Sequence, residues 1–311
     1  MVFNQDRVKR ILVVSLSNIG DVILTFPVVD VLRESYPRAE ISLVCGPKAA
    51  SLFHGDNCFQ EVCVFDKQGG AFHKLGLIGG LFKKRFNLTV DLRNSAIPFL
   101  CLSQKATPIV FQKKEGEHAR DRHLRRLSQV LSFNGGAEKK YAISFSDHDT
   151  AFIEKMILEE FEGMGRYILI APGAAAFDKR WPVEKFAELA DLLIRQHHVR
   201  VGFVGDESDS EVAHKIFALM KEERKAANLC GKTSLRQLAA LMTRAKIIVS
   251  NDSAPMHLAS YLDRPVVGLF GPSDERQYGP WSSESLCLTG MNSLAPGKVL
   301  KSSFWQDNLQ Y

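Results

Sequence analysis

Two stretches of this chain each begin with a continuous apolar run, followed by a glycine-containing turn and an amphipathic helical pattern. The first passes from the apolar run 10–16 through the turn 17–21 into the helical pattern 22–35, and the second passes from 167–171 into 183–196. Apolar runs of this length, with such turns and helices after them, are typical of buried parallel strands. Because this unit occurs twice, the chain is expected to form two sheets.

Further apolar runs extend both units, at 40–44 and 88–92 in the first and at 199–204, 247–250 and 265–270 in the second. Strands that alternate with helices predict the α/β class, with doubly wound parallel sheets of the Rossmann type. A chain of 311 residues also exceeds what one core usually organises.

The boundary between the two domains is expected near 145–165, where a polar capping segment precedes the helical pattern 150–161. We therefore divide the chain into an N-terminal domain, 1–160, and a C-terminal domain, 161–311, facing each other across a cleft. Ligands of open parallel sheets bind beyond the carboxyl ends of the strands, so functional residues are expected there.

Positive charge is concentrated in one part of the chain. Residues 67–140 hold fifteen Lys or Arg and five Asp or Glu, a net charge of +10, whereas the whole chain carries +5 and the remainder therefore −5. A basic block in an otherwise acidic protein indicates an anionic partner for that region, with a solvated surface as the alternative. The total charge is too mild to indicate nucleic acid.

Cysteines and apolar runs favour a cytosolic protein. The six cysteines include no CxxC pair and sit mostly among apolar neighbours, as buried side chains of a reducing compartment do. The apolar run 11–14 is too short for a signal peptide, and no run reaches the length of a transmembrane helix.

The most informative motif is SNDSAPMH at 250–257, between a predicted strand and a predicted helix. Backbone amides at Ser253 and Ala254, with the positive end of the helix dipole, suit a diphosphate, and His257 adds a donor in the first turn. Helix capping by Asp252 or Ser253 is the alternative, although capping alone does not need the whole string.

A second motif is APGAAAFDKRWP at 171–182. Small residues such as Gly173 let a backbone approach a ligand, and Lys179 can neutralise a departing phosphate. The alternative is a surface loop with Trp181 packed against the protein.

Acidic residues follow two of the predicted strands. Asp21, in SNIGD at 17–21, can accept a proton from a sugar hydroxyl, or it can cap a helix. Asp209 and Glu211 follow the run 199–204, where acids hydrogen-bond ribose hydroxyls or simply favour a helix start. Of these two acids, Asp209 is the preferred ligand contact.

Two further signals are discounted as metal sites. The DHD sequence at 147–149 lies at a predicted helix start, where capping explains both acids. His197 and His198 lie at a predicted helix end, where the dipole favours histidine.

Read together, these motifs resemble glycosyltransferase family nine, the ADP-heptose:lipopolysaccharide heptosyltransferases. The likeness spans about residues 10–281, and its matching segments occur in the family's order: IGD at 19–21, HARDR at 118–122, KRWP at 179–182, GKTSL at 231–235, DSAPMH at 252–257 and PVVGLFGP at 265–272.

The resemblance implies a GT-B fold with an N-terminal acceptor domain and a C-terminal nucleotide-sugar domain. It implies inverting, metal-independent transfer of heptose from ADP-heptose to the Kdo/heptose inner core of lipopolysaccharide, either Kdo-lipid A or a heptosylated core, with no cofactor. Asp21 would be the general base and Lys179 would hold the diphosphate. The implied donor-binding residues are Gly173, Asp209, Asp252, Ser253, Ala254 and His257.

The same resemblance assigns Arg120, Arg122 and Arg125 to the acceptor. Arg122, Arg125 and Arg126 are spaced to share one side of a helix, which could face the anionic core or an anionic inner-membrane surface, giving peripheral contact. The chain departs from the family in the alanines at 174–176, and in 282–311, which only weakly indicates the helix that usually crosses back to the first domain.

Three alternatives remain open. One is a transferase for another nucleotide sugar, and a second is a sugar-nucleotide-binding protein without catalysis. A nicotinamide-dependent oxidoreductase is disfavoured, because the chain lacks GxGxxG after its strands.

Overall fold

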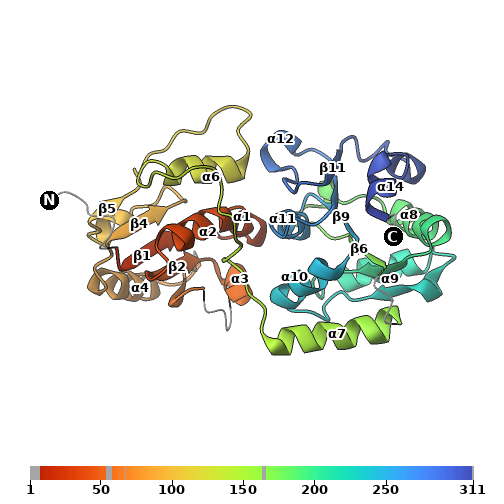
Figure 1. Cartoon of the computed structure of the whole chain (residues 1–311), viewed down its shortest axis with the longest axis horizontal. Helices are drawn as coiled ribbons and strands as arrows, with labels where there is room; N and C mark the ends of the chain where they lie inside the picture. Colours follow the sequence, from red (N-terminus) through yellow and green to blue (C-terminus); the bar gives the residue numbers. More distant parts are fainter. Residues whose placement is uncertain (1–7, 54–57, 67, 163–165, 310–311) are drawn as a thin grey trace. The chain divides into compact units, whose positions relative to one another are not determined.

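The computed structural model of this chain divides into two compact units, 1–144 and 145–311 (Figure 1). The residues described are 8–53, 58–66, 68–162 and 166–309. Each unit contains one parallel sheet with helices between its strands, so the predicted α/β class with two Rossmann-like domains is confirmed.

The first unit has a five-stranded sheet in the order β3-β2-β1-β4-β5. Its strands are β1 (Arg10–Val14), β2 (Glu40–Cys45), β3 (Glu61–Val64), β4 (Leu88–Asp91) and β5 (Lys105–Ala106). Its helices are α1 (Ile19–Ile23), α2 (Phe26–Ser35), α3 (Pro47–Ala50), the 3-10 turn η2 (Ser51–Phe53), α4 (Ala71–Lys83), α5 (Ile97–Leu100) and α6 (Ala119–Leu127).

Alternation along the strands of this sheet builds a core on each face. Leu12 and Val14 of β1 pack in one cluster with Leu81 of α4 and Ile97 of α5. Leu12 and Val14 are two residues apart and point to the same face of the sheet, so α4 and α5 cover that face. Helix α2 contacts α6. In Figure 1, α4 and α6 accordingly lie on opposite sides of strands β1 and β2.

The second unit has a six-stranded sheet in the order β11-β10-β9-β6-β7-β8. Its strands are β6 (Tyr167–Ala171), β7 (Arg200–Phe203), β8 (Ala226–Asn228), β9 (Ile247–Asn251), β10 (Val266–Leu269) and β11 (Ser285–Leu288). Its helices are α7 (Asp147–Phe161), η3 (Phe177–Lys179), α8 (Val183–His197), α9 (Asp209–Phe217), η4 (Glu223–Lys225), α10 (Leu235–Arg244), α11 (Ala254–Tyr261), α12 (Glu275–Tyr278), α13 (Pro296–Val299) and α14 (Ser303–Leu309).

Strand order places a topological switch point in each sheet. In the first unit the chain leaves β1 toward β2 on one side, while β4 pairs with β1 on the other. In the second unit, β6 leads to β7 on one side and β9 leads to β10 on the other. Crevices at the carboxyl ends of strands at such points are the usual ligand sites of these sheets.

The helix expected over 22–35 is divided into α1 and α2. The hydroxyl of Thr25 donates to the carbonyl oxygen of Val22 at 2.6 Å and lies 2.9 Å from the hydroxyl of Ser15. Pro27 follows in the first turn of α2 and lacks the N–H that a continuous helix would use. The break holds α1 as a separate turn directly after β1.

The helix before residue 162 belongs to the second unit, so the unit boundary lies some way before the division expected at 160. A capping box begins α7, because the Ser146 hydroxyl accepts from Asp149 N and the Asp149 carboxylate accepts from Ser146 N. Asp149 also forms an ion pair with Arg236 of α10 at 2.9 Å. Asp149 therefore caps and anchors this helix, as expected, while Asp147 is an exposed acid in its first turn.

All six cysteines are free, and five are buried, with Cys287 partly exposed. Burial raises the pKa of Cys45 and of Cys230 to about 12, so these thiols stay protonated at neutral pH. This matches the expected role as small apolar side chains. Over the described part of the chain, no helix combines the length and hydropathy needed to cross a bilayer.

The segment after Trp281 packs on the core of the second unit, although its residues only weakly indicated a terminal helix. Trp305 of α14 is fully buried, and its indole N–H donates to the carbonyl oxygen of Val299 at 2.7 Å. Met291 and Leu309 join the same cluster, together with residues of α8. These residues thus complete the hydrophobic core of this unit.

We predict that Trp305→Ala lowers the free energy of unfolding by about 3–5 kcal/mol, because it removes a buried indole and leaves a cavity. Urea denaturation followed by circular dichroism measures the change. Leu158→Ala, at an exposed leucine of α7, is the control and should change stability by about 0.5 kcal/mol or less. Equal effects of the two substitutions would show that α14 is not part of the core.

Candidate functional site

The amino end of α11 follows β9 directly and is not capped by a side chain. Ser253 is the N-cap residue, yet it makes no side-chain cap hydrogen bond, and its hydroxyl instead lies 3.1 Å from that of Ser250. Pro255 in the first turn has no N–H to satisfy. The alternative of simple capping is therefore not realised. The turn Asp252–Ala254 therefore stays a candidate anion site.

Lys179 and Asp252 form an ion pair beside this turn. The Lys179 ammonium, from η3, lies 2.7 Å from the Asp252 carboxylate, which is 5% exposed. His257, from the first turn of α11, places its Nε2 at 4.0 Å from the other carboxylate oxygen. The structure thus brings together Lys179, Asp252, Ser253, Ala254 and His257.

Asn251 joins the two loops that carry these residues. Its side-chain N–H donates to the carbonyl oxygen of Pro172 at 2.7 Å, and its side-chain oxygen accepts from the backbone N–H of Trp181 at 3.1 Å. Trp181 is buried, and its indole donates to the carbonyl oxygen of Met291 at 3.0 Å. The tryptophan anchors the loop, while Lys179, two residues earlier, reaches the turn.

Gly173 and Asp209 also lie together, at the carboxyl ends of β6 and β7. A Cβ atom added at Gly173 or at Gly205 would overlap the Asp209 carboxylate. Burial and the nearby charge of Asp206 raise the pKa of Asp209, against the lowering effect of a hydrogen bond from the Asp206 backbone and of Arg180. Glu211, in contrast, is exposed and pairs with Lys215 on its own helix. Asp209 therefore stays the preferred candidate of these two acids.

Asp21 lies in the first unit, in the third position of α1, just beyond the end of β1. Its carboxylate accepts a hydrogen bond from the Asn18 side chain at 2.9 Å, and Asn18, not Asp21, is the N-cap residue. Capping therefore does not account for Asp21. Gly46 packs against this turn so closely that an added Cβ would lie 2.6 Å from the carbonyl oxygen of Ser17.

The arginines of α6 divide into different environments. Arg125 forms a two-point ion pair with Glu117, at 2.6 and 2.7 Å. Arg126 is buried and donates to Asn94 and to the carbonyl oxygen of Pro108. The expectation that Arg126 faces a partner is therefore wrong, because its guanidinium is used inside the unit.

Arg120 and Arg122 extend from the same helix and are only partly buried. Arg120 forms an ion pair with its neighbour Asp121 at 2.7 Å. Two charged neighbours, Arg122 and Arg126, also flank the buried His123, whose pKa falls to about 3 mainly through burial. His123 is consequently neutral and does not add to the charge of this helix.

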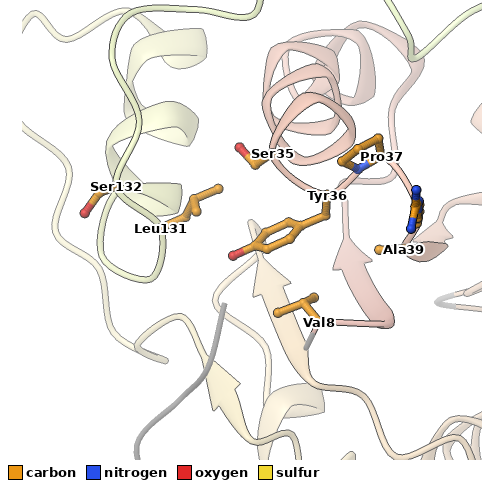
Figure 2. Close-up of a pocket in the computed structure, with 8 residues that line it drawn as sticks. Val8, Ser35, Tyr36, Pro37, Ala39, Leu131 and Ser132 are labelled. Atoms are coloured by element: carbon orange, nitrogen blue, oxygen red, sulfur yellow. The ribbon is translucent and has the colours of Figure 1, made fainter. Parts of the chain in front are cut away.

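A separate cavity of about 330 Å³ lies at the opposite end of the first sheet (Figure 2). It is lined by Val8, just before β1, by Tyr36 and Ala39, just before β2, and by Leu131. This is the amino end of the strands, away from the switch point where ligands of such sheets bind. The cavity is therefore not the candidate site.

Two site residues were not foreseen. Asn251 stood inside the recognised motif, but its bridging role depends on a loop about 70 residues earlier in the chain. Trp281 stacks on His257, with ring centroids 5.9 Å apart and an interplanar angle of 25°. A local pattern contains no signal for such a distant aromatic contact.

We predict that Asp209→Asn makes the protein more stable at neutral pH. Because the folded-state pKa of this acid is raised above its ordinary 3.8, ionising it opposes folding once the pH exceeds that value. The amide removes this cost and can still accept from Asp206 N, so the gain should shrink as the pH is lowered toward 3.8. Thermal unfolding across a pH series measures the difference.

The matched control is Glu211→Gln, because the pKa of Glu211 is lowered by its hydrogen bond from Lys215. No gain in stability is expected for it at neutral pH. If Asp209→Asn changed stability equally at every pH, ionisation of the Asp209 carboxylate would not be what opposes folding.

Comparisons with known proteins agree with this arrangement of motifs. The model of glycosyltransferase family 9 (heptosyltransferase) matches residues 105–304. The chain is 26% identical over 294 residues to the lipopolysaccharide core heptosyltransferase OpsX of Haemophilus influenzae, covering 88% of this chain and 82% of that protein. It is 25% identical over 284 residues to lipopolysaccharide heptosyltransferase 3 of Escherichia coli, covering 85% and 83%.

Solved structures show the same fold. A family 9 glycosyltransferase from Veillonella parvula superposes with a TM-score of 0.83 at 24% identity, covering 99% of this chain and 98% of the other. ADP-heptose lps heptosyltransferase II of E. coli gives a TM-score of 0.77 at 24% identity, covering 96% and 98%. These matches confirm the predicted fold of the GT-B type. The family model covers more than half of the residues and shows that the chain belongs to glycosyltransferase family 9, the heptosyltransferases.

Proposed function

We propose that this chain is an inverting glycosyltransferase that moves heptose from ADP-heptose to the Kdo/heptose inner core of lipopolysaccharide. The observation that carries the proposal is the pairing of Lys179 with the uncapped amino end of α11, in a chain of this family. The names of its relatives, which include lipopolysaccharide heptosyltransferases, support this donor and acceptor class.

The second unit would bind the donor. The backbone of Asp252–Ala254 and the ammonium of Lys179 would hold the diphosphate, with His257 as a further donor. Asp209 would accept a hydrogen bond from a ribose hydroxyl, since its carboxylate stands at the end of β7 beside Gly173. As the ADP leaving group departs, negative charge grows on its β-phosphate, and these donors stabilise that charge.

The first unit would supply the base. The Asp21 carboxylate would accept the proton of an acceptor hydroxyl while that oxygen attacks the anomeric carbon of heptose. The bond from the anomeric carbon to the phosphate oxygen breaks in the same displacement, so the configuration inverts and ADP leaves with the electron pair. A cation and a helix amino end would balance the charge without a metal ion.

The acceptor would be recognised by cations of α6. Arg122 is the preferred acceptor contact among these arginines. Arg120 and Arg125 form ion pairs with Asp121 and Glu117, respectively. To bind the acceptor, these two arginines would exchange the acidic side chains for acceptor carboxylates or phosphates. The acceptor carries a lipid in this proposal, so the protein would act in the cytoplasm, in peripheral contact with the inner membrane.

We predict that Asp21→Asn preserves ADP binding and lowers the transfer rate by about 10²–10⁴-fold, the usual contribution of a general base. Calorimetric titration with ADP and a transfer assay with ADP-heptose and Kdo-lipid A measure the two quantities. Asp147→Asn, at an exposed acid of α7, is the control and should leave both unchanged. Full activity of Asp21→Asn would show that Asp21 is not the general base.

Metal independence has its own test. Wild-type activity that is lost with a chelator and restored by a divalent cation would contradict it.

We also predict that Lys179→Gln weakens ADP binding by about ten- to a hundredfold, the usual effect of losing a hydrogen bond to a charged group. Lys155→Gln removes an equal charge at an exposed side chain of α7 and should bind ADP as the wild type does.

Titration with UDP and NAD beside ADP tests the donor class. Tighter binding of UDP would indicate another nucleotide sugar, and tighter binding of NAD would indicate an oxidoreductase.

A further inference from the structure

Large apolar side chains are exposed on one region of the first unit. Five of the ten such residues found over the described chain belong to α4, to α5 and to the turn after it, within 28 residues of sequence: Leu75, Phe82, Phe99, Leu100 and Leu102. We call these five residues the α4–α5 face. Single exposed apolar residues are ordinary, but a group of this size on one surface usually marks a binding site.

The inner side of the same two elements is already used. Leu81 of α4 and Ile97 and Cys101 at α5 are buried in the core cluster under the sheet, and Leu77 packs against it. Leu75 and Phe82 are seven residues apart, about two helical turns, so they lie together on the other side of α4. Because α4 contacts α5, we expect the outward residues of both to lie on adjoining parts of the surface.

The exposure of these side chains is substantial. Leu75 is 64% exposed, Phe99 67% and Leu102 69%. Leu102 also has a positive φ of 45°, a backbone conformation that is uncommon for a residue of this kind. The turn therefore holds a leucine toward solvent at some cost, with no contribution to the core.

Positively charged residues lie close in sequence to the α4–α5 face. Residues 75–105 contain five Lys or Arg and one acid, Asp91, which is fully buried at the end of β4. Lys83 and Arg85 are exposed at the end of α4, while Lys84 forms an ion pair with Glu61. Apolar side chains flanked by cations match the chemistry of an anionic lipid surface, in which the apolar groups enter the boundary and the cations meet the head groups.

We propose that the α4–α5 face is the surface through which this protein docks on anionic phospholipid bilayers. The inference deepens the membrane contact of the proposed function and assigns it to α4 and α5, away from the arginines of α6. Docking through this face would hold the first unit, with Asp21, near lipid-anchored acceptors, while the water-soluble donor reaches the second unit from solution.

Co-sedimentation of the full chain with vesicles tests the proposal. One set contains phosphatidylcholine alone, and the other contains phosphatidylcholine mixed with phosphatidylglycerol. The wild type should bind the phosphatidylglycerol vesicles more tightly, and added salt should weaken this preference. Equal binding to both lipids, or no binding, would overturn the proposal.

Two pairs of substitutions separate the apolar and charged contributions. Phe82→Ser with Phe99→Ser should reduce binding to the anionic vesicles by about tenfold or more, because the variant lacks two aromatic rings that would be transferred from water into the bilayer. Lys83→Gln with Arg85→Gln should reduce it by about thirtyfold at low salt and remove most of the salt dependence. The matched controls are Leu158→Ser with Leu219→Ser, at exposed leucines elsewhere, and Lys298→Gln with Lys301→Gln, all of which should bind as the wild type does.

Equal losses in the variants and in their controls would overturn the assignment to this face. So would sedimentation of the wild type as a dimer that Phe82→Ser with Phe99→Ser dissociates, because the face would then be covered by a second copy. Transfer to an acceptor sugar freed of its lipid, and ADP binding, should be unchanged in every variant. If the wild type itself shows no heptose transfer, the proposed function is contradicted, while the vesicle-binding result still stands.

Discussion

The side-chain amide of Asn251 donates one hydrogen bond and accepts another inside the second unit, and the loops of the donor half depend on this pair of bonds. The amide joins the loop after β6 to the end of β9, the two strands at the switch point of the sheet. With Trp181 fixed in this way, η3 lies where Lys179 can reach Asp252. A carboxylate at position 251 could accept but not donate, so it would leave the carbonyl oxygen of Pro172 without its partner.

Both units place their candidate residues at the same point of their topology. In the first, Asp21 follows β1 and the buried Asp91 ends β4, the neighbouring strand across the switch point. The Asp91 carboxylate accepts from the backbone N–H groups of Arg93 and Ser95, so it organises a turn and is not presented to a ligand. The first unit thus has one acid, Asp91, whose carboxylate organises a turn, and a second acid, Asp21, that follows the neighbouring strand.

The sequence predicted the central strands well, because residues such as Ile11 to Val14 and Ile168 to Ile170 are buried on both faces of a parallel sheet and form unbroken apolar runs. The edge strands β3, β5, β8 and β11 were not predicted, since they are short and their residues are mostly only partly buried. The recognised motifs gave the candidate residues at α11 and η3. The Asn251 bridge, the burial of Arg126 and the stacking of Trp281 could not be predicted, because each depends on contacts between distant segments.

The packing of Asp209 between Gly173 and Gly205 has a consequence for how this family can diverge. No side chain fits at either glycine while the carboxylate occupies its present place, so substitutions at the three positions are coupled. A lineage that replaced Asp209 with a smaller residue would free both glycines to vary, and the reverse change would then be blocked. Among related sequences, the identity of the residue at 209 should therefore covary with the presence of glycine at 173 and 205.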